Sequence, residues 1–334
     1  MNYQGRIEKV REFIDKRKLP ALLIKNPSNI FYLTGLLEIE GILVVDTTSI
    51  HLFAPLLYHQ EVVDLSPVKI HIIKYKKDKF KKFLKRYKKT GLIEAEFSFS
   101  TWNAFSKDNI KLVPLPDFIK QMRMIKEKEE IQLIKKALEI NRKVFRDIEK
   151  EIKIGMEETV IAGRVHYLIR KYGGRREAFE PIIASGVHSS YPHHKNRKKG
   201  VEKGKPLIID AGVDLNGYKS DLTVTLFPGD SPDKKFMEYF KILKDVQNSL
   251  MDFVKIGMTG RALHNYAVKF LKKKCLERYF IHGLGHGVGI DVHELPMIAP
   301  GSKDKLKEGC VFTIEPGIYI PGEGGIRLEE MVFL

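Results

Sequence analysis

The sequence predicts an α+β protein of two domains, a small α/β domain over residues 1–118 and a larger domain of duplicated α+β units over residues 119–334. Three observations lead to this prediction. A chain of 334 residues exceeds the usual size of one hydrophobic core. Apolar strand patterns alternate with charged helical patterns in the first domain. The tetrapeptide Lys-Ile-Gly-Met occurs at 153–156 and again at 255–258, each time between two helical patterns, which indicates an internal repeat.

The elements of the first domain are short and end at a proline-containing boundary. Apolar runs at 21–24, 41–45 and 71–75 predict strands. The segment 112–118 places the boundary near Phe118, because a proline disfavours helical backbone at the residue before it. A long amphipathic helix is predicted after the boundary. Its apolar stripe consists of Ile131, Ile134, Leu138, Phe145, Ile148 and Ile152.

Composition limits the class of protein. The two cysteines, Cys275 and Cys310, have neither disulfide-framework nor zinc-site spacing, which fits a reducing compartment. No apolar run approaches the roughly 20 residues that span a bilayer, and the N-terminus lacks the apolar core of a signal peptide. We therefore expect a cytoplasmic protein without a membrane partner.

The net charge of +16 comes mostly from lysine, concentrated at residues 74–89. Such a cluster could contact an anionic partner. The alternative is the solvated face of an amphipathic helix, which aromatic and aliphatic residues at helical spacing favour. These residues are Tyr75, Phe80, Phe83, Leu84 and Tyr87.

A predicted hairpin in the larger domain brings two carboxylates together. The dipeptide Asn216-Gly217 lies between two apolar runs and is the strongest short signal for a two-residue turn. Counting outward from the turn, Asp210 faces Thr223, and Asp221 is the diagonal neighbour of Asp210 on the same face. Two buried carboxylates repel each other and lose hydration, which a bound cation would offset. The alternative is a pair of exposed aspartates on an ordinary hairpin.

A second predicted hairpin brings another pair of carboxylates together. The sequence Pro-Gly-Glu-Gly-Gly supplies its turn between two apolar runs. A turn centred on Gly322 sets Glu315 opposite Glu329. Glu323 and Glu330 are expected to point to solvent.

A glycine-rich segment connects the two hairpins. Glycines alternate from Gly283 to Gly289 and exclude a stable helix, so His282 and His286 are not a helical pair of zinc ligands. In an extended chain the two histidines share one face, and the glycines leave the other face bare for close approach. A dinucleotide-binding fingerprint is not supported, because strand, tight turn and helix do not follow in order. His166 and His264 lie on helical patterns and are interpreted as structural.

The clustered side chains suit two divalent cations. They form a hard, oxygen-rich set for which manganese or cobalt is expected, with zinc or iron as alternatives. A pair of such ions lowers the pKa of a bound water and polarises a carbonyl, which indicates hydrolysis. The set consists of Asp210, Asp221, His286, Glu315 and Glu329.

The ordered motifs resemble a known family. DAG(x)8D contains Asp210 and Asp221, and HGLGHGVG, VHE, EPGIY and GGIRLEE follow it. This series is similar to the metallopeptidase branch of the pita-bread fold, specifically the Xaa-Pro peptidases, prolidase and aminopeptidase P. The segment NPSNIFYLTG at 26–35 is similar to their small N-terminal domain, so the resemblance covers nearly the whole chain. It implies a homodimer that cleaves small peptides with proline at the second position.

The resemblance also implies a role for each metal ligand. Asp210 would bind one metal ion, and Asp221 and Glu329 would bridge both. His286 and Glu315 would bind the other ion. Glu315 would in addition act as general base toward the bridging water.

Further residues match family positions on the substrate side. His193 in SYPHHK and His293 in VHE match histidines that contact the substrate and stabilise the tetrahedral intermediate. The two histidines lie at corresponding distances from the two copies of the repeated tetrapeptide, which agrees with a paired role. His282 and Arg327 match positions that shape the substrate side or support the ligands. His194 is interpreted as a neighbour without a role.

The sequence departs from the family pattern at two places. Met297 stands where prolidases commonly carry an arginine that holds the free carboxylate of a dipeptide. Xaa-Pro dipeptidase and Xaa-Pro aminopeptidase activities therefore both stay open. Val224 replaces an arginine that is usual in the family, and this change does not touch any of the predicted ligands.

Two other functions were considered from the sequence. Methionyl aminopeptidases share the catalytic domain but usually lack the N-terminal domain. A catalytically silent pita-bread module that binds protein or nucleic acid would use the lysine run as its contact surface. Such relatives generally lose the metal ligands, so the sequence favours the peptidase, and no nucleic-acid partner is expected.

Overall fold

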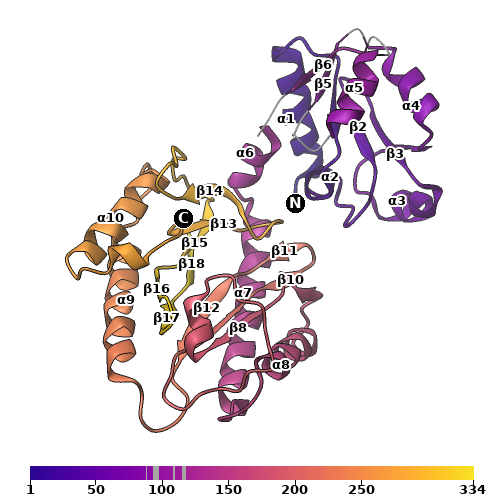
Figure 1. Cartoon of the computed structure of the whole chain (residues 1–334). Coiled ribbons are helices and arrows are strands. Elements are labelled where there is room, and N and C mark those ends of the chain that lie inside the picture. The colour runs from indigo at the N-terminus through magenta and orange to yellow at the C-terminus, as the bar shows by residue number, and fades with distance from the viewer. Residues whose placement is uncertain (88, 93–97, 108–109, 115–117) are drawn as a thin grey trace. The chain divides into compact units, whose positions relative to one another are not determined.

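The chain divides into two compact units, Met1–Arg123 and Met124–Leu334 (Figure 1). The sequence-based boundary at residue 118 falls at the start of α6 (Phe118–Met124). Part of the preceding proline-containing segment, residues 115–117, lies outside the described residues. The computed structural model describes residues 1–87, 89–92, 98–107, 110–114 and 118–334.

The described residues of the first unit form a mixed six-stranded sheet in the order β4-β3-β2-β1-β5-β6. Its strands are β1 (Ala21–Ile24), β2 (Ile42–Asp46), β3 (Ile50–Ala54), β4 (His71–Lys74), β5 (Thr90–Leu92) and β6 (Leu112–Pro114). Its helices, besides α6, are α1 (Tyr3–Lys16), α2 (Pro27–Thr34), η1 (Leu56–Tyr58), α3 (His59–Leu65), α4 (Lys77–Leu84) and α5 (Phe99–Lys107). The predicted strands of this domain correspond to β1, β2 and β4.

The lysine run contains α4, which has one apolar face. Phe80, Phe83 and Leu84 are buried, and the rings of Phe80 and Phe83 contact the ring of Phe53 with centroids 4.8 and 4.9 Å apart. Most lysines of this helix are exposed, as expected for a solvated face. The spacing predicts Tyr75 on the apolar stripe, and this prediction is wrong: Tyr75 is 42% exposed, because it lies between β4 and the start of the helix. Lys88 lies outside the described residues.

The second unit is built from two matching halves. Each copy of the repeated tetrapeptide lies in the turn between two helices, with Gly155 at φ 82° and Gly257 at φ 91°, values that favour glycine. The two turns bond to distant segments in the same way, Gly155 N to Val201 O and Gly257 N to Leu306 O, both at 2.8 Å. The predicted repeat is therefore present in the structure. The paired helices are α7 (Lys128–Glu151) with α8 (Glu158–Lys171), and α9 (Lys234–Phe253) with α10 (Gly260–Lys272).

The strands of the second unit form separate small sheets. In the described residues their orders are β11-β10-β7, β12-β9-β8, β14-β13-β15-β18 and β16-β17. The first half contains β7 (Arg176–Glu177), β8 (Ile182–Ser185), η2 (Gly186–Ser190), β9 (Leu207–Ala211), β10 (Val213–Leu215), β11 (Tyr218–Lys219) and β12 (Leu222–Leu226). The second half contains η3 (Glu277–Tyr279), β13 (Gly285–Gly287), β14 (Glu294–Ile298), β15 (Val311–Ile314), β16 (Gly317–Ile320), β17 (Gly324–Arg327) and β18 (Glu330–Phe333).

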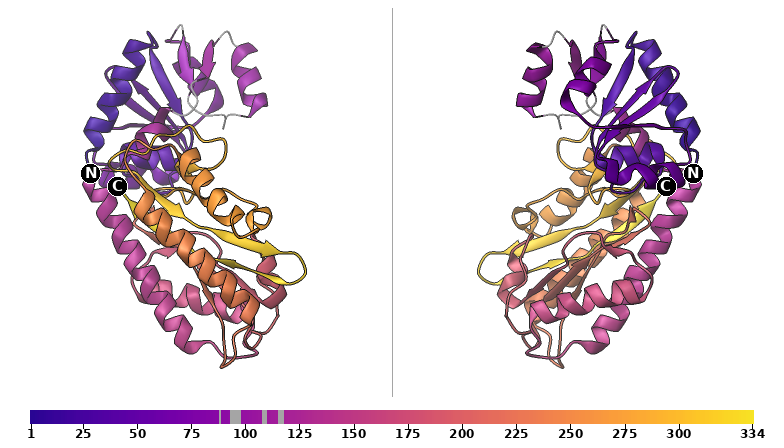
Figure 2. Two further views of the ribbon diagram at one scale, coloured as in Figure 1. Left: turned by 90° about the vertical axis from the view of Figure 1, so that its left-hand side faces the viewer. Right: turned by 90° about the vertical axis from the view of Figure 1, so that its right-hand side faces the viewer.

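The helices pack on the apolar side chains of these strands. Helix α7 contacts β10, β11 and β12, and α8 contacts β8. In the left-hand view of Figure 2, α9 and α10 lie in front of the yellow strands. This contact buries one continuous cluster that includes Leu243, Val246, Leu250, Leu263, Ala267, Leu271, Phe312, Ile314, Ile318 and Ile326. The polar residues of the strands therefore collect away from this cluster.

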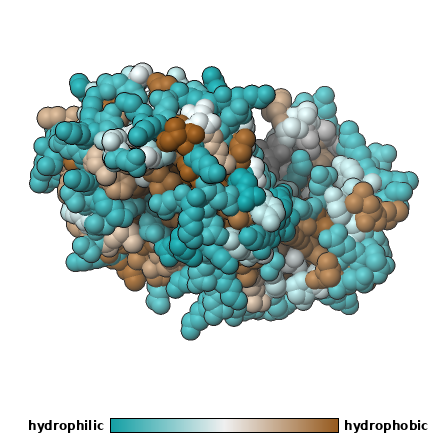
Figure 3. Space-filling model, turned by 90° about the horizontal axis from the view of Figure 1, so that it is seen from below, coloured by the Kyte–Doolittle hydropathy of each residue, from teal (hydrophilic) through white to brown (hydrophobic). Residues whose placement is uncertain are grey.

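The surface seen in Figure 3 is mostly hydrophilic, with single hydrophobic residues scattered between polar ones. Isolated exposed hydrophobic residues of this kind are ordinary on folded proteins. Within the described ranges, no helix combines the length and the apolar composition that crossing a membrane takes.

Candidate metal centre

The first hairpin has the predicted register. Asn216 and Gly217 both have positive φ, at 53° and 85°, as a two-residue turn of this kind requires. Strands β9 and β12 pair antiparallel, and Asp210 lies opposite Thr223. Asp221 directly precedes β12, and both aspartates are buried. The turn chemistry therefore sets the relative position of the two carboxylates.

The second hairpin places Glu315 opposite Glu329. Strands β16 and β17 pair Gly317 with Arg327, and β15 and β18 pair residue 314 with residue 330, so the same register holds on both sides of the two glutamates. The neighbouring acidic residues behave as expected for a solvent-facing position. The half-exposed Glu323 pairs with Lys235 at 2.5 Å, and Glu330 pairs with Arg142 at 2.8 Å.

The glycine-rich segment is extended, and β13 carries His286 into the same place. A Cβ atom on Gly285 would lie 2.0 Å from Thr313 O, and one on Gly287 would lie 2.1 Å from Leu295 O. Only glycine permits this close approach of the flanking strands. The structure therefore agrees with the extended chain predicted for this segment.

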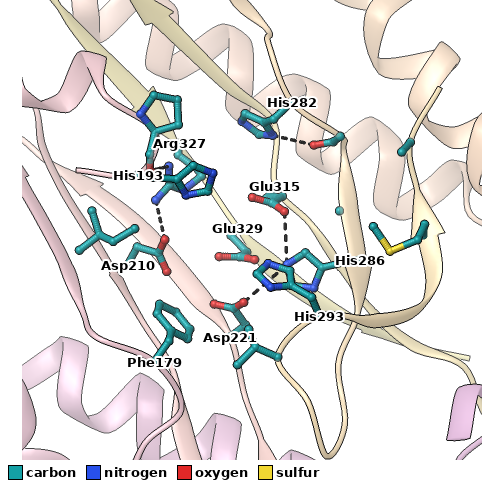
Figure 4. Close-up of a pocket in the computed structure, with 17 residues that line it drawn as sticks. Phe179, His193, Asp210, Asp221, His282, His286, His293, Glu315, Arg327 and Glu329 are labelled. Carbon is teal, nitrogen blue, oxygen red and sulfur yellow. Dashed lines mark hydrogen bonds and ion pairs between the residues drawn. The ribbon is translucent and has the colours of Figure 1, made fainter. Parts of the chain in front are cut away.

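All of the predicted site residues line one cavity of about 360 Å³ (Figure 4). They come from both halves of the second unit, so the cavity lies between the two repeats. The acidic and imidazole groups point toward one another across it. The set is Asp210, Asp221, His286, Glu315 and Glu329, with His193, His282, His293 and Arg327 around them.

The distances among these side chains fit a shared cation. His286 Nε2 lies 3.7 Å from Asp221 Oδ2 and 3.5 Å from Glu315 Oε1. One ligand atom from each of Asp221, His286 and Glu329 can be chosen so that all lie within 4.8 Å of one another. Within the described part of the chain, Asp210 Oδ1 and Asp221 Oδ1 are buried without a hydrogen-bond partner. Buried carboxylate oxygens of this kind need a cation or a proton.

The electrostatics of the cavity lead to the same conclusion. Burial, together with the neighbouring carboxylates, raises the pKa of Asp221 and of Glu329 well above the usual range. Burial raises the pKa of Glu315 to about 8. Burial, with the adjacent His293, lowers the pKa of His286 to about 3, so this imidazole is neutral and available as a ligand. The donor set fits two divalent cations, which would keep the carboxylates ionised.

Comparison with known proteins decides the family. A match to metallopeptidase family M24 covers residues 132–334, and a match to the creatinase/prolidase N-terminal domain covers residues 6–125. This chain belongs to metallopeptidase family M24. The matches confirm the predicted α+β class, with a pita-bread fold in the second unit.

The M24 chain is similar to its relatives over almost its whole length. It is 38% identical to the Xaa-Pro dipeptidase of Pyrococcus furiosus, over 98% of this chain and 94% of that protein. It is 31% identical to a putative Xaa-Pro aminopeptidase of Mycoplasma pneumoniae, over 99% and 94% of the two chains. The crystal structure of the prolidase from Pyrococcus horikoshii superposes with a TM-score of 0.94 at 34% identity, covering 99% of this chain and 95% of that one.

Arg327 of this M24 chain lines the cavity and supports one of the carboxylates. Its Nη2 donates to Asp210 Oδ2 at 2.5 Å, and its Nη1 donates to Tyr319 Oη at 2.8 Å. Its Nε donates to Thr223 Oγ1 at 3.2 Å, and the Thr223 hydroxyl in turn donates to Glu329 Oε2 at 2.7 Å. The guanidinium thus fixes two predicted ligands, one directly and one through a threonine.

Thr223 and Tyr319 were missed as site residues by the sequence reasoning. The register counted from the turn sets Thr223 opposite Asp210. This position beside a predicted ligand is the sequence signal that could have identified Thr223. Tyr319 lies in the EPGIY motif, but no local pattern shows that its hydroxyl reaches Arg327. His282 Nε2 also lies 3.1 Å from the Tyr319 hydroxyl, so the tyrosine links the histidine to the arginine.

His193 and His293 lie on different sides of the carboxylates. In Figure 4, His193 lies beside Arg327 and Asp210, whereas His293 lies beside His286. The His286 and His293 rings meet edge to face, with centroids 4.0 Å apart. Desolvation, and secondarily the charge of His193, lowers the pKa of His293, which favours a neutral imidazole.

Three other histidines of the second unit contact structural partners. His166 Nδ1 lies 3.3 Å from Glu177 Oε2, and His166 Nε2 lies 3.5 Å from Glu180 Oε1. His264 is buried and stacks on a phenylalanine ring. His194, interpreted from the sequence as having no role, is buried, and its Nε2 lies 2.8 Å from a carboxylate oxygen of Glu158.

Replacing Arg327 by alanine is expected to lower the free energy of unfolding by about 3 to 5 kcal/mol, because the buried Asp210 then loses its guanidinium partner. Urea unfolding measures the change. Arg142→Ala is the matched control, because that arginine forms an exposed pair and its loss should cost at most about 1 kcal/mol. Equal losses in the two variants would contradict a supporting role for Arg327.

Proposed function

We propose that this chain is a dinuclear-metal exopeptidase that hydrolyses the Xaa-Pro bond at the N-terminus of small peptides. The observation that carries the proposal is the convergence of four carboxylates and one neutral imidazole in a single cavity between the two repeats. The cavity wall carries further histidines that can serve a substrate. Relatives that are similar over nearly the whole chain are named Xaa-Pro dipeptidase or Xaa-Pro aminopeptidase.

The five converging residues would hold the two ions. Asp210 would bind one ion, Asp221 and Glu329 would bridge both, and His286 with Glu315 would bind the other. Oxygen-rich sets of this kind suit manganese or cobalt, with zinc or iron as alternatives. When bound, a pair of divalent ions would lower the pKa of a water and polarise the carbonyl of the scissile bond.

Glu315 is the proposed general base. Its carboxylate accepts the proton of the attacking water as the new bond forms between the water oxygen and the scissile carbonyl carbon. The same proton then reaches the proline nitrogen, and the carbon–nitrogen bond breaks. The half-buried carboxyl of Glu315 lies within reach of His286, so it faces the reacting groups rather than bulk solvent.

The histidines are proposed to act on the substrate. His193 and His293 lie on opposite sides of the carboxylates and can donate to the oxyanion and hold the scissile amide. His282, partly buried and within hydrogen-bond distance of the Tyr319 hydroxyl, would shape the substrate side. Arg327 would act through the residues that it holds, since its donors are directed to Asp210, Tyr319, Thr223 and the carbonyl of Pro192.

We also propose that the protein works as a homodimer in the cytoplasm. The support is the overall likeness to the family together with the cysteine usage. Sedimentation or light scattering of the purified protein tests the dimer, and a monomer at working concentration would contradict it.

The proline preference is tested with matched peptides. We expect release of alanine from Ala-Pro-Ala, no release from Ala-Ala-Ala, and no release of methionine from Met-Ala-Ser, each followed by mass spectrometry. Release from Met-Ala-Ser with none from Ala-Pro-Ala would identify a methionyl aminopeptidase instead. The match to a creatinase/prolidase N-terminal domain favours the proline peptidase.

Substrate length is expected to depend on Met297, which lines the cavity and is 39% exposed. Arg327, the one arginine or lysine among the described residues that line the cavity, is already bonded to Asp210, so the free carboxylate of a dipeptide gains no new ion pair. We therefore expect the wild type to prefer Ala-Pro-Ala over Ala-Pro. Met297→Arg should raise kcat/KM for Ala-Pro relative to Ala-Pro-Ala by about 10-fold, the value of one charge-assisted hydrogen bond.

Met297→Leu is the matched control, because it keeps the size and apolar character of the side chain. Its ratio of the two substrates should equal that of the wild type. An unchanged ratio in Met297→Arg, or a wild type that already prefers Ala-Pro strongly, would contradict the assignment of substrate length to this position.

A further inference from the structure

Glu158 is a fully buried carboxylate that the proposed chemistry does not use. It is the first residue of α8, and its side chain points to the segment between β8 and residue 197. Its Oε1 accepts from Ser185 N at 3.0 Å and faces His188 Nδ1 at 2.9 Å. Its Oε2 faces His194 Nε2 at 2.8 Å and accepts from Arg197 N at 3.0 Å. Each oxygen thus binds one backbone amide and one imidazole.

The segment that Glu158 holds is the one that carries His193. His194, its direct neighbour, is tied to Glu158, and Pro192 on the other side accepts a hydrogen bond through its carbonyl from Arg327 Nη1 at 3.2 Å. His193 itself is exposed at the cavity wall. Its imidazole therefore depends on its two neighbours for its position, because an exposed side chain has few packing contacts of its own.

We propose that Glu158 is a positioning residue for the proposed reaction, which holds His193 at the wall of the metal cavity through His188, His194 and the backbone of the segment. This inference rests on the proposed function, since it concerns how a substrate-facing histidine is placed. Glu158 touches neither the metal ligands nor the substrate, so its effect on the reaction passes through His193.

The second half of the unit has no carboxylate at the position that corresponds to Glu158. Each helix pair begins its second helix after the repeated turn, with Glu158 first in α8 and Gly260 first in α10. A Cβ atom on Gly260 would lie 2.0 Å from Met297 O, so the chain there approaches the helix directly. The repeat geometry therefore does not require an acidic residue at this position. In the first half, the acidic residue Glu158 is accompanied by two histidines that face its carboxylate, His188 and His194.

A glutamate with two histidines is also a set that can bind zinc. The oxygen-to-nitrogen distances of 2.9 and 2.8 Å are those of hydrogen bonds, and both oxygens also bind backbone amides. The carboxylate is therefore satisfied without an ion. A third tightly bound metal equivalent in the wild type, absent from Glu158→Gln, would overturn the positioning role.

Glu158→Gln tests the proposal with the smallest change in shape. An amide has one oxygen and one NH2 group, and a histidine can change its tautomer to suit either. A backbone N–H group, in contrast, can only donate a hydrogen bond. Whichever way the glutamine turns, its NH2 group faces the N–H of Ser185 or of Arg197, and the segment shifts. Because a displacement near 1 Å can cost about 100-fold in rate, we expect kcat to fall by about 10- to 100-fold with two metal equivalents still bound.

A double-mutant cycle separates positioning from general damage. If Glu158 acts through His193, then Glu158→Gln should change kcat/KM by no more than about twofold in a His193→Ala background. Equal losses in both backgrounds would overturn the proposal. Glu151→Gln is the matched control, because this half-buried glutamate pairs with Arg164 between α7 and α8 and should leave kcat/KM unchanged.

Variants of His194 keep the test decisive if Glu158→Gln does not fold. His194→Gln retains an N–H that can donate to Glu158, whereas His194→Ala does not. We expect kcat to fall in His194→Ala and to stay close to the wild-type value in His194→Gln. This difference between the two variants should be seen only when His193 is present. Equal activity of the two variants would overturn the proposal. A wild type that shows no peptidase activity at all would count against the proposed function and not against this inference.

Discussion

Glu315→Gln is expected to lower kcat/KM for Ala-Pro-Ala by about 1,000-fold or more, within the range that loss of a general base produces. The amide cannot accept the proton of the attacking water, and it removes one negative charge from the metal centre. The loss should fall on kcat, because the missing interaction is made in the transition state. Initial rates at saturating metal, beside the metal content of the same sample, measure the effect.

Glu323→Gln is the matched control for this substitution. Glu323 lies on the turn of the same hairpin, half-exposed and paired with Lys235. Its replacement should leave kcat/KM within about twofold of wild type, as for most surface changes. A Glu315→Gln protein that keeps about a tenth or more of wild-type kcat/KM at full metal content would contradict its role as the base.

The metal-free protein is expected to lose stability as the pH rises from about 6.5 to about 8. Below this window the partly buried His282 and the buried His286, whose pKa values are lowered from 6.5, act with the opposite sign. Burial raises the pKa of Glu315 from 4.5 to about 8, and burial together with the neighbouring carboxylates also raises the pKa of Asp221 and of Glu329. In this pH window the folded state binds more protons than the unfolded state, so rising pH favours unfolding. The contribution is fully present below the unfolded pKa of Glu315 and is lost as the pH passes the folded value.

Urea unfolding of chelated and metal-loaded protein across this window tests the linkage. In the metal-loaded protein the free energy of unfolding should change less with pH, because bound cations keep the carboxylates ionised. Metal-free Glu315→Gln should show a smaller pH slope than the metal-free wild type. A metal-free wild type whose stability is constant or rises with pH would contradict the account of the buried carboxylates.

The convergence of the four carboxylates could be predicted because local turn chemistry determines it. The turn at Asn216 and Gly217 sets the register of Asp210 and Asp221, and the turn near Gly322 does the same for Glu315 and Glu329. Counting outward from each turn was therefore enough to pair the carboxylates. The internal repeat could also be predicted from a local signal, because the repeated tetrapeptide forms the same turn in both halves. Each copy contains a glycine with positive φ, Gly155 in the first half and Gly257 in the second.

The supporting contacts could not be predicted, because they join segments far apart in the chain. Arg327 reaches Asp210 and Tyr319, and Glu158 reaches His194, and neither set shares a periodic pattern or a turn. His194 was consequently set aside as a neighbour without a role. Tyr75 was misplaced for a different reason: helical spacing alone does not show where a helix begins.

The central claim is tested most directly by alanine release from Ala-Pro-Ala before and after metal is removed and restored. The account predicts that release stops in the chelated protein and returns on reloading with manganese or cobalt, while Ala-Ala-Ala stays intact throughout. Undiminished release by protein verified to be free of metal, or no release from either Ala-Pro-Ala or Ala-Pro with manganese, cobalt, zinc or iron, would contradict it.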